Sequence, residues 1–284
     1  MSVPTNPSHP QLRQLGGRPG IREYFRDIWR RRDFAVAIST GEIRSQNMDT
    51  VLGNIWHLLN PLLLAGVYYL IFGVLLGDVL SRGVDNFALF IVVGVMSFHF
   101  SQKSIISGAQ AVTSNEGLIR SIRFPRAILP ISTVLGQAIA FVPALFVMVV
   151  ISLITGETPR WAWFLLVPLF LVQTVFNVGA AFIVARLTDS FKDVANLLPF
   201  LFRLMFYFSG VLYPVTRFIG DSQLQLLFDF NPFYVFVTLF RGPMLGEMEV
   251  FDTYLASIGL GWTALLLVGG FFYFRAGEER YGRA

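Results

Sequence analysis

The sequence predicts an all-α polytopic membrane protein with six transmembrane helices, and two observations carry this prediction. Hydrophobic residues fill 54% of the 284 positions and charged residues only 14%, whereas soluble domains carry about 25% charge. Six blocks of mostly apolar residues are each long enough, as a helix, to cross a hydrocarbon core of about 30 Å. The blocks cover residues 57–77, 86–106, 127–155, 161–185, 194–215 and 253–274.

The basic residues predict the orientation of these helices. Of the 22 Lys and Arg residues, 17 lie in segments on the same side as the N-terminus, four lie on the opposite side, and Arg203 lies within a block. Cytoplasmic loops of membrane proteins carry an excess of Lys and Arg. We therefore expect both termini in the cytoplasm.

The segment before the first block is expected to lie outside the membrane core. Residues 1–19 are polar and rich in Pro and Gly, so we expect a flexible cytoplasmic tail and no signal peptide. Residues 20–33 repeat apolar side chains at helical spacing, among them Tyr24, Phe25 and Trp29, with arginines largely on the opposite side. This pattern is typical of an amphipathic interfacial helix with its aromatic rings in lipid. The alternative is a helix packed on a soluble partner.

The segment between the last two blocks differs from the other outer loops. It spans residues 216–252 and contains the apolar run FNPFYVFVTLF at 230–240. This run is too short to cross a membrane and too apolar for an exposed loop, so we expect a re-entrant or interfacial pair of helices at the outer leaflet. The permease domain then covers residues 20–275, and residues 276–284 form a cytoplasmic tail.

Several classes of function are disfavoured by what the sequence lacks. There is no cysteine, and the three histidines form no HExxH motif, so we expect no metal site and no Cys nucleophile. No glycine-rich loop ending in Gly-Lys-Ser/Thr is present, so we expect neither a nucleotide site nor catalysis in this chain. The basic residues lie where they would face lipid head groups rather than nucleic acid. No acidic residue falls within a block, so energy for active transport would come from another chain.

Short motifs occur in a fixed order along the chain. They are LG-x-x-W followed by NP at 52–61, N-x-x-L-I with FP and LP at 115–130, R-x-x-D at 186–189, S-G-V-x-Y-P at 209–214, and NP with a downstream Arg at 231–241. In the order of these motifs, their spacing and the side of the membrane on which they are expected, the chain resembles the membrane subunit of the type-2 ABC exporters. The branch it resembles exports polysaccharides such as O-antigens, teichoic acids and galactans.

The resemblance implies partners. It implies a homodimer of this subunit bound to two copies of an ATPase subunit, which would hold ATP and Mg²⁺. It also implies that the cytoplasmic loop around 107–122 is the coupling element. A short helix there, exposing Asn115, Glu116, Arg120 and Arg123, would fit a cleft in a soluble partner. A solvated loop that merely follows the charge asymmetry is the alternative.

The fifth block carries the candidate substrate path. Arg203 lies deep in this block, where an arginine is disfavoured by ~2.5–3.5 kcal/mol on insertion scales. It would either line a channel for a lipid pyrophosphate or serve a structural role. Phe206, Tyr207 and Gly210 share its helical face and would line the channel with it, because aromatic rings can stack on sugars. The first block adds two candidates, Tyr68 and Tyr69.

The sequence and the resemblance together predict the channel-forming permease of an ATP-driven exporter. It would move a lipid-linked polysaccharide of the O-antigen, galactan or teichoic-acid type across the bacterial cytoplasmic membrane. Two alternatives stay open, a type-2 exporter permease for drugs or lipids and an integral-membrane glycan transferase. The transferase would need acid–base or metal-binding groups near the membrane surface, and the clustered carboxylates there, Asp189 and Asp193, look structural.

Overall fold

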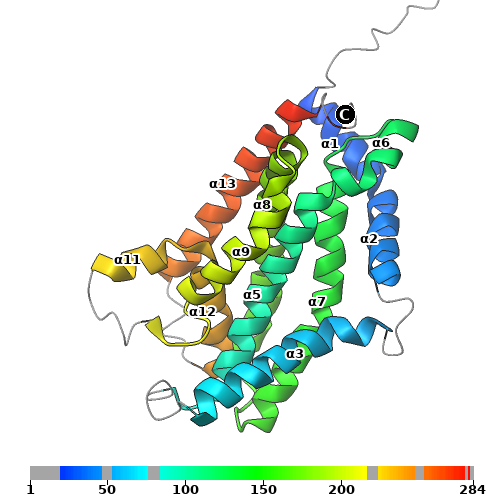
Figure 1. Cartoon of the computed structure of the whole chain (residues 1–284). Helices are drawn as coiled ribbons and strands as arrows, with labels where there is room; N and C mark the ends of the chain where they lie inside the picture. Colours follow the sequence, from blue (N-terminus) through cyan, green and yellow to red (C-terminus); the bar gives the residue numbers. More distant parts are fainter. Residues whose placement is uncertain are drawn as a thin grey trace, which may run out of the picture.

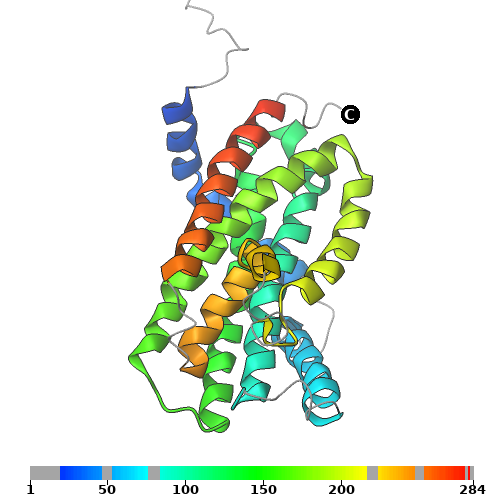
Figure 2. The same cartoon turned by 90° about the vertical axis from the view of Figure 1, so that its left-hand side faces the viewer.

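The protein is a bundle of α-helices (Figures 1 and 2). The computed structural model describes residues 20–46, 53–75, 84–215, 223–246, 253–278 and 281. Within these segments four helices are long and apolar enough to cross a membrane. They are α5 (Phe87–Gln110), α7 (Ile128–Ile154), α8 (Leu166–Ser190, preceded by a 3-10 turn Trp161–Leu165) and α13 (Thr253–Gly277). They coincide with the second, third, fourth and sixth predicted blocks, which confirms an α-helical polytopic membrane protein.

The first and fifth predicted blocks form shorter helices. The first block is α3 (Trp56–Tyr68), which continues into a π-helical segment (Tyr69–Leu75). Figure 1 shows α3 crossing α5 and α7 obliquely, toward the end of the bundle away from α1. The fifth block is α9 (Asp193–Phe208), which follows α8 after a tight turn and packs on α5. It ends short of the predicted boundary because the chain turns at Gly210, where φ is +58°.

Two helices precede α3. The predicted helix at 20–33 is α1 (Ile21–Arg30). A second helix, α2 (Arg32–Gln46), packs along α7, where Ser39 Oγ donates to the carbonyl oxygen of Ser132 at 2.6 Å. A Cβ atom at Gly136 would meet Ser39 only at ordinary van der Waals distance, so the two helices pack here without requiring a glycine. The sequence did not predict α2, because its apolar residues form no clear stripe at helical spacing.

The segment predicted to form a helix pair contains α11 (Gln223–Asp229) and α12 (Pro232–Leu245). Asn231 starts α12, because its side-chain oxygen accepts from the backbone N–H of Phe233 at 3.0 Å. Every residue from Tyr234 to Met244 is buried, and α12 packs against α5, α8 and α13. Most of the apolar run predicted at 230–240 is therefore enclosed by neighbouring helices.

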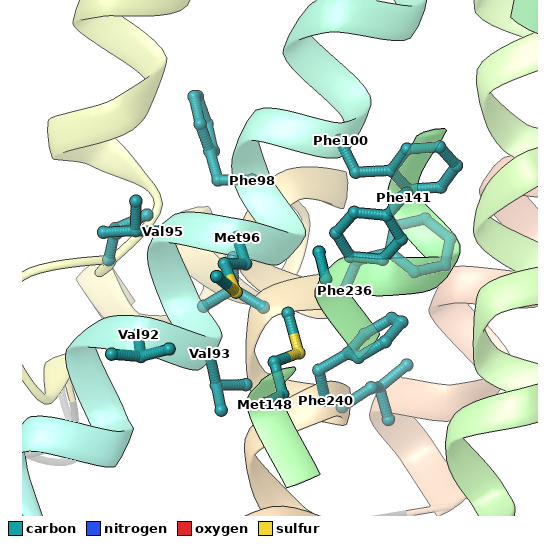
Figure 3. Close-up of a cluster of buried hydrophobic side chains, with 14 of the residues drawn as sticks. Val92, Val93, Val95, Met96, Phe98, Phe100, Phe141, Met148, Phe236 and Phe240 are labelled. Atoms are coloured by element: carbon teal, nitrogen blue, oxygen red, sulfur yellow. The ribbon is translucent and has the colours of Figure 1, made fainter. Parts of the chain in front are cut away.

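Aromatic side chains fill much of the core around α5 (Figure 3). Phe100 of α5 stacks on Phe141 of α7 with ring centroids 4.5 Å apart, and Phe98 meets Phe206 of α9 edge-on at 5.2 Å. Lipid tails are as apolar as these rings, so close packing rather than the hydrophobic effect must hold such helices together. Shape-matched aromatic contacts serve that purpose.

Helices α8 and α13 approach each other closely. A Cβ atom added at Gly179 would collide with the backbone of Leu266, and one added at Gly270 would collide with the carbonyl oxygen of Gly179. The two backbones are therefore in direct contact. Only glycine at these two positions permits this packing.

Candidate functional site

A short helical loop joins α5 to α7 at the end of the bundle where α1 lies (Figure 1). It contains a 3-10 turn (Thr113–Asn115) and α6 (Glu116–Ser121). Asn115 Nδ2 donates to the carbonyl oxygen of Ala111 at 2.9 Å, which satisfies a backbone group at the end of α5. Ile119 is buried in an apolar cluster beneath the loop and Leu118 packs against the same cluster, so two side chains anchor α6.

The charged residues of this loop differ in exposure. Arg120 and Arg123 are exposed, whereas Asn115 and Glu116 are half-buried at the base of the loop. Arg120 Nη2 lies 3.4 Å from Glu116 Oε2, one helical turn away. An exposed pair of this kind contributes little to stability, so Arg120 can exchange this carboxylate for one on a partner at small cost. The loop thus offers two accessible guanidinium groups to an acidic surface.

The aromatic residues of α1 do not all face the same way. Phe25 and Trp29 are 52% and 69% exposed, in keeping with a lipid-facing side. Tyr24 is only 2% exposed, so the prediction that it lies in lipid is wrong. Its ring packs edge-on against Phe271 of α13, with centroids 5.8 Å apart. Periodicity identified the apolar face of α1 but could not show that α13 covers part of it.

Tyr24 is also the centre of a polar contact. Its hydroxyl donates to Glu278 Oε1 at 2.8 Å and accepts from the backbone N–H of Ala127 at 3.3 Å. Burial and the adjacent Glu278 raise the pKa of Tyr24 above its ordinary value. The phenol therefore stays protonated and remains a donor at neutral pH.

The candidate channel residues divide into two groups. Arg203 and Tyr207 are exposed on one side of α9, while Phe206 is buried and stacks on Tyr68 of α3 at 5.2 Å. Tyr68 is half-buried and lies close enough to Arg203 and Tyr207 to interact with both electrostatically. Four predicted residues from two helices therefore come together. Of the remaining two, Tyr69 is exposed on the π-helical segment, and Gly210 is buried in the turn after α9.

Gly210 belongs to a cluster around Arg241, whose side chain is 5% exposed. Arg241 Nη1 donates to the carbonyl oxygen of Gly210 at 2.8 Å and Nη2 to that of Val211 at 2.6 Å. Arg241 Nε donates to the carbonyl oxygen of Phe90 at 3.2 Å, and its guanidinium lies 3.3 Å from the centroid of the Phe90 ring. One side chain of α12 therefore ties the turn after α9 to the N-terminal half of α5.

Asn231 holds the other side of the same turn. Its Nδ2 donates to the carbonyl oxygen of Phe208 at 3.0 Å and to Ser209 Oγ at 3.2 Å. Two motifs that are separate in the sequence, S-G-V-x-Y-P and NP with a downstream Arg, thus form one structure. From the sequence, Arg241 was counted among the outer basic residues and as the arginine of the second motif, and was given no structural role. The signal for its role was a lone arginine at the end of an otherwise apolar run.

These features define a multi-pass helical membrane protein with a cationic helical loop at one end. The sequence profile of the ABC-2 type transporter family matches residues 35–245, and the chain belongs to that family. The family predicted from the motifs is therefore confirmed. In this family ATP is bound and hydrolysed by a separate subunit, so this chain is a membrane component that works with an ABC ATPase.

Curated relatives match most of the chain. The O-antigen export system permease protein RfbA of Myxococcus xanthus is 28% identical over 216 residues, which cover 76% of this chain and 82% of the relative. A protein of the same name from Klebsiella pneumoniae is 26% identical over 238 residues, 84% of this chain and 89% of the relative. The polysialic acid transport protein KpsM of Escherichia coli is 24% identical over 212 residues, 72% of this chain and 78% of the relative.

Proposed function

We propose that this chain is the channel-forming permease of an ATP-driven exporter that moves a lipid-linked polysaccharide out across the bacterial cytoplasmic membrane. The relatives are named for the export of O-antigen or polysialic acid, both of which are glycans. The observation that carries the proposal is the exposed pair Arg203 and Tyr207 beside Tyr68. A cation suits the phosphates of a lipid carrier, and an aromatic ring suits the apolar face of a sugar.

The proposed topology has six crossings, with both termini in the cytoplasm. In it, α3 and α9 are the first and fifth crossings, and α11 and α12 form the re-entrant pair at the outer leaflet. Two features support this arrangement. The loop before α7, the start of α1 and the end of α13 lie at one end of the bundle (Figure 1). The buried state of α12 suits a helix that enters the membrane without crossing it.

The proposed assembly contains two copies of this chain and two ATPase subunits. The loop of residues 113–123 docks on the ATPase through Arg120 and Arg123, with Asn115 and Glu116 shaping its base. The side of α9 that bears Arg203 and Tyr207, together with α3, lines the path between the two copies. Exposed polar side chains within an apolar helix support a water-filled or ligand-filled surface there.

Reconstitution of the purified chain with its ATPase subunit in lipid vesicles tests the substrate class. We expect lipid-linked polysaccharide to stimulate ATP hydrolysis. Replacing Tyr207→Leu or Arg203→Met should lower the stimulated part about five-fold, the effect of one lost contact of about 1 kcal/mol. Hydrolysis without substrate should be unchanged.

Phe208→Leu is the matched control. Phe208 is adjacent to Tyr207 on α9, aromatic and similarly exposed, at 58% against 50%, but it faces another direction. It should leave the stimulation intact. If drugs or unglycosylated lipids stimulate hydrolysis and polysaccharide does not, the exporter serves another substrate class and the proposal is wrong.

A further inference from the structure

Three segments that are far apart in the sequence meet at the end of the bundle near α1. Glu278 Oε1, just past α13, accepts from Tyr24 Oη of α1 at 2.8 Å and from the backbone N–H of Arg126 at 2.9 Å. The Arg126 guanidinium donates to the backbone carbonyl of Glu278. We call Tyr24, Arg126, Ala127, Glu278 and Tyr281 the cytoplasmic joint.

Tyr281 holds the chain after α13 against the end of that helix. Tyr281 is 1% exposed, its hydroxyl donates to the carbonyl oxygen of Phe274 at 2.7 Å, and its ring lies 4.8 Å from that of Phe274. A Cβ atom at Gly277 would lie 2.9 Å from Tyr281 Oη, so a larger residue there would displace the ring. Within the segment 276–284, the described residues Glu278 and Tyr281 are therefore docked on the protein.

The joint connects the proposed docking loop to helix α1. Arg126 lies five residues after the end of α6, the helix of the proposed docking loop, and just before α7. Tyr24 lies on α1, which also carries the exposed residues Phe25 and Trp29. The single oxygen Oε1 of Glu278 accepts from both segments. Hydrogen bonds to an ionised carboxylate are among the stronger polar contacts in proteins.

We infer that Glu278 is a positioning residue that makes α1, the docking loop and the end of α13 move as one body during the transport cycle. Motion that the ATPase imposes on the loop then reaches the interfacial helix through Glu278 rather than only through α5 and α7. This inference rests on the proposed docking of the loop on the ATPase.

The test measures a distance and a coupling ratio in the full complex with the ATPase. Because the chain has no cysteine, spin labels can be placed at Arg26→Cys on α1 and Ser121→Cys on α6, both of which are exposed. We expect the distance between the labels to stay the same with and without bound nucleotide. In Glu278→Ala it should change between the two states, and polysaccharide exported per ATP should fall about five-fold.

Conservative variants separate positioning from folding. Glu278→Gln keeps an oxygen that accepts from Tyr24 and Arg126, so its coupling ratio should stay close to that of the parent protein. Tyr24→Phe keeps the ring and removes one donor, so it should lower the ratio even if Glu278→Ala is unstable. Glu23→Ala, an exposed carboxylate on the same helix, is the matched control and should have no effect.

Two results would overturn the inference. One is a distance that changes with nucleotide in the parent protein. The other is a Tyr24→Phe variant with unaltered distance and coupling. ATPase co-purification is recorded for every variant and should not depend on Glu278. Its loss on charge reversal of the loop instead reports on the docking proposal, so the two ideas can fail separately.

Discussion

At the scale of single residues, Arg241 shows how a buried cation can organise a membrane protein. It binds two consecutive carbonyl groups in the turn after α9 and one on a neighbouring helix, at Gly210, Val211 and Phe90. Leaving such buried carbonyls without a donor would cost about 1–3 kcal/mol each. The geometry requires room for the guanidinium, and Gly94 of α5 provides it.

Gly94→Ala should therefore destabilise the protein. A Cβ atom at this position collides with Arg241 Nη2, and crowding of this kind costs about 1–3 kcal/mol. Thermal inactivation in detergent, followed by size-exclusion chromatography, measures the effect. Gly261→Ala on α13, where a Cβ atom meets nothing within 4 Å, is the control. Equal stability of the two variants would contradict the role assigned to Arg241.

Single-residue roles were the hardest to predict from the sequence. The position of Arg203 within an apolar block marked it as unusual. The structure shows that its side chain is exposed rather than buried between helices. Tyr24 was placed by periodicity, and Arg241 by its charge and by a motif that gave it no structural role. Their roles depend on which helix lies beside them, and periodicity within one helix carries no information about its neighbours.

At the scale of elements, the loop between α5 and α7 is small but well anchored. Ile119 holds it from below, while Arg120 and Arg123 remain at the surface. The i,i+4 pair of Arg120 with Glu116 is exposed, so replacing Arg120 should not unfold α6. The loop can therefore be altered in charge without loss of the fold.

The double variant Arg120→Glu/Arg123→Glu should lose the ATPase subunit. We expect co-purification to fall at least about ten-fold, equivalent to about 1.4 kcal/mol of binding free energy. The control Arg22→Glu/Arg26→Glu reverses two exposed arginines of α1 at the same end of the bundle. If both pairs of changes leave the complex intact, the docking element lies elsewhere.

Element boundaries were predictable where the membrane sets them. The four long helices start and end within a few residues of their predicted blocks, apart from the C-terminal extension of α8 to Ser190, because hydrocarbon thickness fixes the length of an apolar helix. Where length is not fixed in this way, prediction was poorer. Helix α2 was missed, and α9 ends at Phe208 because of a glycine turn inside a run that reads as continuous.

At the scale of the whole molecule, the proposed orientation makes a direct prediction. Introduced cysteines should react with a membrane-impermeant maleimide from opposite sides. Thr158→Cys, in the loop after α7, should be labelled in intact cells, and Ser121→Cys only after permeabilisation; both side chains are exposed. Labelling of Leu227→Cys on α11 from the cytoplasmic side would disprove the outer re-entrant pair.

The backbone contact between α8 and α13 has a consequence for biosynthesis. Helix α8, which contains Gly179, is synthesised before α13, which contains Gly270. The contact surface around Gly179 is therefore uncovered until α13 is inserted. A nascent polypeptide interrupted before α13 would present this bare surface, together with Phe182, which packs on Phe271 and Phe274. An incomplete subunit would thus differ from a finished one by an exposed surface that α13 covers in the complete protein.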